Sequence, residues 1–149
     1  MDNFKQNVIK DIVQELDCGF DCYYNSKTGE IIGIPNFSKF INEEDFKAVF
    51  CDSLEKIENN KSDFIKFEAL KSFESFRIME RFADQVADLK IKAELEYVLT
   101  NKKPFKNFKH KIDTSELRQN WFEFKQDELG KMVEKQLANE RSSSQQRRE

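Results

Sequence analysis

Glycine, proline, cysteine and histidine are all scarce in this chain of 149 residues, which contains four Gly, two Pro, three Cys and one His. Because glycine and proline mark turns and helix ends, their scarcity argues against long irregular loops and favours helix. The cysteines are odd in number, and a chain of this length buries enough surface to fold without cross-links. They therefore predict free thiols in a reducing cytoplasm instead of a disulfide framework.

Long apolar runs and an excess of basic residues are missing as well. No stretch approaches the roughly 20 apolar residues that a membrane helix needs, and the first residues contain no apolar signal core. The net charge of −3 excludes a globally basic nucleic-acid binder, although a local basic patch is still allowed. The sequence therefore predicts a cytoplasmic protein that does not associate with a membrane.

Aromatic residues, in contrast, are abundant, because the chain contains fifteen Phe. Disordered chains are poor in aromatic residues, so this chain is expected to fold. Its length is close to the commonest domain size, which predicts a single domain over residues 1–140. Residues 141–149 include no apolar side chain, and we predict that they form a disordered polar tail.

Hydrophobic periodicity predicts an α+β fold. An amphipathic helix over residues 3–16 precedes a β-hairpin, whose turn contains Gly29. Asn42 is expected to cap a second helix, and residues 64–70 alternate as a third strand. The stripe predicted to be buried on that second helix consists of Phe46, Val49, Phe50, Leu54 and Ile57.

The chain from Ser72 onward has a helical pattern throughout. Asp88 is expected to cap one of these helices, and Gly130 interrupts the last one, where it favours a bend. Trp121 falls on the apolar stripe of that last helix and is predicted to face the core. The expected architecture is a small antiparallel sheet, a hairpin plus a third strand, packed against a mostly helical C-terminal layer.

Histidine and cysteine give little support for catalysis or for a metal centre. His110 is the only histidine, and any catalytic triad would have to use it, but its neighbours are Lys109 and Lys111 and no adjacent carboxylate orients it. The spacing of Cys18 and Cys22 is unlike that of a zinc-binding turn. We therefore expect no cofactor, and we expect His110 to be an exposed polar residue.

Three carboxylates recur at four-residue intervals, at Glu80, Asp84 and Asp88. On one helix they would share a face, where they could hold a divalent metal ion or contact a basic partner. The alternative is that Arg77 and Arg81, three residues away, neutralise them as part of a solvated face. These carboxylates are the metal site of a second hypothesis, in which the protein is a metal-dependent enzyme.

The segment from 102 to 111 contains five lysines and no acid. Lys102, Lys103, Lys106, Lys109 and Lys111 surround two phenylalanines, and Arg118 would extend the patch. Clustered lysines suit phosphate backbones, and exposed aromatic rings suit bases. The alternative is that Phe105, Phe108 and Ile112, three or four residues apart, face the core and leave the lysines in water.

The order of several short segments resembles a known family. These segments are Thr28-Gly29-Glu30-Ile31-Ile32, Ser75-Phe76-Arg77-Ile78-Met79-Glu80-Arg81-Phe82, Pro104-Phe105-Lys106-Asn107-Phe108-Lys109 and Arg118-Gln119-Asn120-Trp121-Phe122-Glu123-Phe124. In this order they resemble the bacterial uncharacterised protein family 0158 of the UPF series, over about residues 5–137. The resemblance implies a bacterial cytoplasmic protein of unknown function and assigns no catalytic residue.

These observations favour a non-catalytic binding or regulatory module that contacts a protein or a nucleic acid. The candidate contact residues for an anion or nucleic acid are Lys102, Lys103, Lys106, Lys109 and Arg118. The alternative is a hydrolase or transferase that uses a divalent metal ion held by Glu80, Asp84 and Asp88. A third hypothesis is a purely structural subunit. Glycine-rich phosphate-binding signatures are absent from the sequence.

Overall fold

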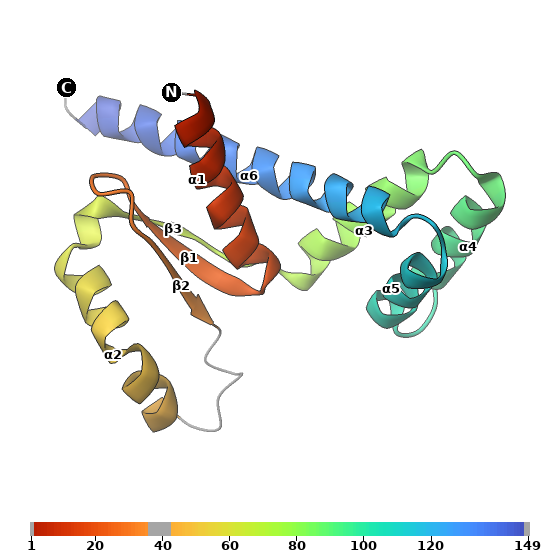
Figure 1. Cartoon of the computed structure of the whole chain (residues 1–149), viewed down its shortest axis with the longest axis horizontal. Coiled ribbons are helices and arrows are strands. Elements are labelled where there is room, and N and C mark those ends of the chain that lie inside the picture. The colour runs from red at the N-terminus through yellow and green to blue at the C-terminus, as the bar shows by residue number, and fades with distance from the viewer. Residues whose placement is uncertain (1, 36–42, 148–149) are drawn as a thin grey trace. The chain divides into compact units, whose positions relative to one another are not determined.

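The computed structural model describes residues 2–35 and 43–147 (Figure 1). The chain divides into two compact units, one formed by Met1–Leu70 with Leu129–Glu149 and the other by Lys71–Glu128. Each unit has a hydrophobic core of its own. The α+β class is confirmed, because helices dominate the chain and a single three-stranded antiparallel sheet is present in the described part.

The sheet of the first unit contains β1 (Phe20–Asn25), β2 (Ile31–Pro35) and β3 (Phe64–Phe67) in the order β2-β1-β3. Both pairings are antiparallel, so the predicted hairpin and third strand are confirmed. Gly29 has a φ of 83°, a left-handed conformation that glycine adopts without a steric penalty. The side chain of Asn25 stabilises the same turn, because its Oδ1 accepts hydrogen bonds from the backbone N–H groups of Lys27 and Thr28.

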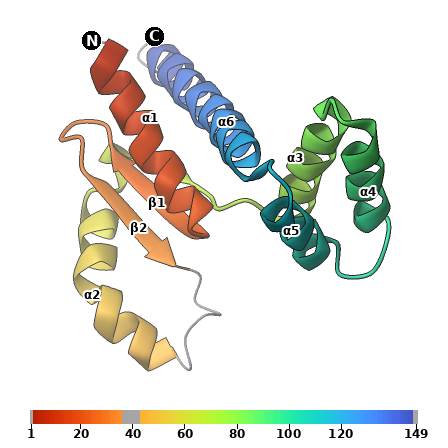
Figure 2. The ribbon, with the colours of Figure 1, turned by 45° about the vertical axis from the view of Figure 1, so that its right-hand side comes forward.

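One face of this sheet is covered by α1 (Asp2–Asp17) and by the C-terminal part of α6 (Arg118–Arg147), which lie alongside each other (Figure 2). The helix predicted over residues 3–16 is therefore confirmed. The buried core between these elements consists of Val8, Ile12, Val13, Leu16, Cys22, Phe67, Leu129, Val133 and Leu137.

The apolar stripe of α2 (Glu43–Asn59) is not buried as predicted. No residue of α2, which the structure describes in full, is buried, and Val49 is 66% exposed. The C-terminal part of the helix, through Leu54 and Ile57, lines a groove together with strand residues. Helical periodicity predicts an amphipathic helix but cannot predict how completely a neighbour covers it. A short 3-10 helix, η2 (Lys61–Asp63), follows, and Asn42 lies outside the described residues.

The second unit is helical, with α3 (Ser72–Gln85), α4 (Leu89–Leu99), α5 (Pro104–Thr114) and the first turns of α6. An aromatic cluster occupies its core: the ring of Trp121 lies 5.3 Å from that of Phe82 and 5.0 Å from that of Phe108, both in edge-to-face geometry. Such pairs stabilise a core beyond the area they bury. Trp121 therefore packs against the core as predicted.

Helix α6 continues through Gly130 to Arg147. Residues 141–147, which the sequence analysis placed in a disordered tail, are thus helical in the structure. Between Gly130 and Arg147 the chain contains neither glycine nor proline, so nothing in the backbone ends the helix earlier. Within the described residues, no helix combines the length and the apolar character needed to cross a membrane.

Candidate functional site

The turn between α4 and α5 presents the first two lysines of the basic segment. Lys102 and Lys103 are exposed, and Lys103 occupies the N-cap of α5 with a left-handed φ of 53°. The side-chain amide of Asn107 donates a hydrogen bond of 2.9 Å to the carbonyl of Lys102. Pro104, whose fixed φ suits the first position of a helix, follows directly. The turn is therefore held by local interactions while both lysine side chains reach solvent.

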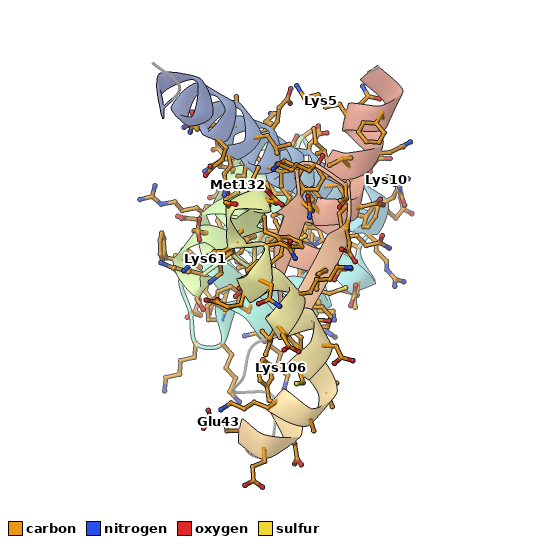
Figure 3. All side chains as sticks on the ribbon, turned by 90° about the vertical axis from the view of Figure 1, so that its left-hand side faces the viewer. Lys5, Lys10, Glu43, Lys61, Lys106 and Met132 are labelled. Atoms are coloured by element: carbon orange, nitrogen blue, oxygen red, sulfur yellow. The ribbon has the colours of Figure 1, made fainter. Side chains whose placement is uncertain are left out.

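Helix α5 directs its apolar side chains inward and its lysines outward. Phe108 and Ile112 are each 1% exposed, whereas Lys106 (Figure 3) and Lys109 point into solvent. The expectation that the phenylalanines face the core is correct for Phe108. Phe105 differs, because it remains 44% exposed although its ring packs edge-on against that of Phe76 at 6.4 Å.

Ion pairing separates the basic residues of this region into two groups. Lys111 pairs with Glu94 on α4, and the Nε of Arg118 lies 4.0 Å from a carboxylate oxygen of Asp113. Among the residues that the structure describes, the other four lysines have no carboxylate within 4.0 Å. We refer to these four as the α5 lysine cluster: Lys102, Lys103, Lys106 and Lys109.

The unit that contains the cluster is nearly neutral, whereas the other unit is acidic. Lys71–Glu128 contains twelve Lys and Arg against eleven Asp and Glu, whereas the other unit has thirteen against seventeen. The acidic character of the chain therefore belongs to the other unit. The cluster also surrounds the N-terminus of α5, whose dipole is positive there and disfavours nearby cations. The local potential is consequently positive and attracts an anion.

The three carboxylates of the metal hypothesis do not share a helix face as the spacing suggested. Glu80 and Asp84 lie on α3, which ends at Gln85, but Asp88 is the N-cap of α4. Its Oδ1 accepts hydrogen bonds from the backbone N–H groups of Lys90 and Ile91, so this carboxylate already stabilises a helix end. Asp84 lies 3.8 Å from the ammonium group of Lys92.

The arginines of α3 also differ from the expected arrangement. Arg81 donates a 2.8 Å hydrogen bond to Glu128 on α6, and does not neutralise the carboxylates of its own helix. A groove of about 630 Å³ lies between α3 and α4, and it is lined by charges of both signs, including Arg77, Glu80 and Glu96. This mixture selects neither a metal cation nor an anion.

One group of potential metal ligands was missed by the sequence analysis. Cys51, Asp52 and Glu55, on consecutive turns of α2, place their ligand atoms within 4.8 Å of one another. All three are exposed, and hard divalent cations prefer oxygen ligands to a thiolate. In the described part of the chain, Glu80, Asp84 and Asp88 do not form such a group.

The three cysteines and the histidine differ in their burial. Cys18 and Cys51 are exposed thiols, and Cys22 is buried in the first core. Burial, reinforced by the carboxylates of Glu15 and Asp11, raises the pKa of Cys22 to about 12, so it is a poor nucleophile. His110 is exposed on α5, as predicted.

Comparison with known proteins identifies a family but no characterised relative. The model described as Uncharacterised protein family (UPF0158) matches residues 4–145, which confirms the resemblance noted in the sequence. No curated protein and no solved structure matches the chain significantly.

Proposed function

The chain belongs to the uncharacterised protein family UPF0158, whose description assigns no activity, so we propose a function from the geometry of the chain itself. The protein is a non-catalytic binding module that contacts a nucleic acid through the α5 lysine cluster, with Arg118 beside it. The observation that carries this proposal is that all four lysines of the cluster are exposed and have no ion pair in the described part of the chain.

The chemistry of the cluster suits phosphates better than bases. An ammonium group is a compact point charge, so it neutralises a phosphate without reading the identity of a neighbouring base. We therefore expect little sequence preference. Each neutralised phosphate releases condensed counterions, which makes the affinity fall steeply with salt concentration. With four lysines and one arginine, about three to five phosphate contacts are expected.

The rest of the chain directs a polyanion to this place. A net charge of −3 repels nucleic acid in general, so only a region that reverses the field locally can bind it. The proposal includes a cytoplasmic location in a bacterium, where nucleic acids are accessible. The exposed thiols of Cys18 and Cys51 fit a reducing compartment of this kind.

The test is fluorescence anisotropy with labelled RNA and DNA at about 50 and 200 mM salt, a range over which phosphate contacts weaken strongly. The parent protein should bind at low salt and lose most of its affinity at the higher concentration. The variant Lys102→Glu/Lys106→Glu/Lys109→Glu should lose binding at both.

A matched control changes the net charge by the same amount elsewhere. Lys10, on α1 (Figure 3), and Lys131 and Lys135, on α6, are exposed lysines of the other unit. The variant Lys10→Glu/Lys131→Glu/Lys135→Glu should retain most of the parent affinity. If the two triple variants bind equally well, or if the parent binds neither nucleic acid at low salt, the proposal is rejected and a protein partner becomes the preferred alternative.

A further inference from the structure

A line of side chains runs along the flank of α5 beside the lysine cluster. Phe105, Lys109 and Asp113 follow one another at four-residue intervals, which places them on one row of the helix surface. Arg118 continues this row onto α6, because its guanidinium lies 4.0 Å from Asp113. Phe122 comes one helical turn after Arg118 on α6. We call this set of five residues the aromatic–basic row.

Both ends of the row carry an exposed aromatic ring. Phe122 is 52% exposed and lines a surface hollow of about 490 Å³ with Arg118 and Gln119. Phe105 is 44% exposed, and the edge-to-face contact with Phe76 fixes the orientation of its ring. A single exposed phenylalanine needs no explanation. Two of them, connected by a row that includes two cations, form a surface with a recognisable chemistry.

We infer that the nucleic acid bound by this module is single-stranded, and that bases stack on Phe105 and Phe122 while the lysines and Arg118 hold the phosphates. This inference rests on the proposed function and adds the class of substrate. Single-strand binders combine a cationic track with aromatic platforms, because every base has a π-face that can stack on a ring. In a duplex the base faces are already stacked on one another, so the two rings would have no partner.

The acidic residues beside the aromatic–basic row are compatible with the binding of a single strand. Asp113 is 45% exposed at its side chain, and its carboxylate lies 4.0 Å from the guanidinium of Arg118, a long and weak contact. Glu123 accepts a hydrogen bond of 3.1 Å from the side-chain amide of Gln119, so it is occupied beside Phe122. The row therefore retains Lys109 and Arg118 as cations between its two rings, next to the remaining lysines of the cluster.

The test compares a labelled single-stranded 12-mer with a 12-base-pair duplex. The parent should prefer the single strand. Leucine keeps much of the apolar contact of each ring and removes its π-face, so Phe105→Leu and Phe122→Leu are the informative variants. Each should weaken single-strand binding by about 5- to 100-fold, the loss expected for one stacked base. Neither should change the salt dependence, because the lysines remain.

The matched control is Phe4→Leu, which removes an exposed ring (66%) on α1 in the other unit. Its single-strand affinity should equal that of the parent. A second readout is independent of variant folding: a 12-mer containing 2-aminopurine should change its fluorescence on binding the parent, because that base analogue reports stacking directly.

Two outcomes separate this inference from the proposed function. Equal binding of single strand and duplex, with no effect of the leucine variants or no 2-aminopurine signal, overturns the single-strand inference and leaves the lysine contacts intact. Absence of binding to both nucleic acids overturns the proposed function itself, and the inference with it.

Discussion

At the scale of single residues, Arg118 and Lys111 differ in how strongly their acids hold them. The guanidinium of Arg118 is 83% exposed and only 4.0 Å from Asp113 at its nearest. Exposed pairs of this kind contribute about 0–1 kcal/mol, so a phosphate can replace Asp113 at little cost. Lys111 is 32% exposed and connects α5 to α4 through Glu94. Lys111 therefore contributes to helix packing, and Arg118 remains available to a ligand.

The thiol of Cys22 tests whether the core of the first unit is buried as the structure shows. Because the thiol is 0% exposed and its pKa is raised from 9.0 to about 12, it is protonated and inaccessible at pH 8. We expect a thiol reagent to modify Cys18 and Cys51 quickly and Cys22 only after denaturant is added.

The raised pKa of Cys22 also predicts that the stability of the protein falls as the pH rises from about 9 towards 12, because the thiol ionises first in the unfolded chain.

The control for the thiol-modification experiment is Cys22→Ala, which should abolish the slow phase and leave the two fast thiols unchanged. Three thiols that react at the same fast rate in the native protein would show that Cys22 is not buried.

At the scale of the element, α6 carries a glycine in its interior. A Cβ added at Gly130 would meet the Cγ2 of Ile9 at 3.8 Å, an ordinary van der Waals distance. Glycine inside a helix is less favourable than alanine by about 1 kcal/mol. Gly130→Ala should therefore stabilise the protein by about 1 kcal/mol and raise the melting temperature by roughly 2–4 °C.

Gly29→Ala provides the matched contrast. A Cβ at Gly29 would have open space, but its φ of 83° is a conformation that alanine adopts only with strain. This variant should lower the melting temperature. If Gly130→Ala also lowers it, the helix at that point is bent or crowded instead of continuous.

At the scale of the whole molecule, the question is whether two compact units unfold as one domain. Helix α6 supplies residues to both cores, with Trp121 and Phe124 against the second and Leu129, Val133 and Leu137 in the first. Unfolding either core therefore frays a helix that the other core uses. We expect a single cooperative transition, in agreement with the one domain predicted from the sequence over residues 1–140.

The measurement uses one probe in each core. Trp121 is the only tryptophan, so its fluorescence reports on Lys71–Glu128, and the reactivity of Cys22 reports on the other unit. Coincident urea midpoints from the two probes would support one cooperative domain. Midpoints that differ by more than the experimental error would establish two domains that unfold independently.

The amino-acid sequence by itself determined the features that depend on neighbouring residues. Period-two and period-3.6 patterns locate the hairpin and the helices, because side-chain direction is fixed by local backbone geometry. The same reasoning places Phe108 inward and Lys106 and Lys109 outward on α5. The lysine-rich segment is also readable from the sequence, since its charge does not depend on any distant residue.

Only the tertiary structure decided which distant groups meet. Arg81 pairs with Glu128, 47 positions away, and no periodicity signals that contact. Within the described residues, Lys111 of the five-lysine segment pairs with Glu94 and the other four lysines have no acid partner. The contact between Asp113 and Arg118 likewise joins two helices. The incomplete burial of the apolar stripe of α2 has the same origin. Burial and ion pairing depend on how elements pack, and a local pattern fixes only the face that each element offers.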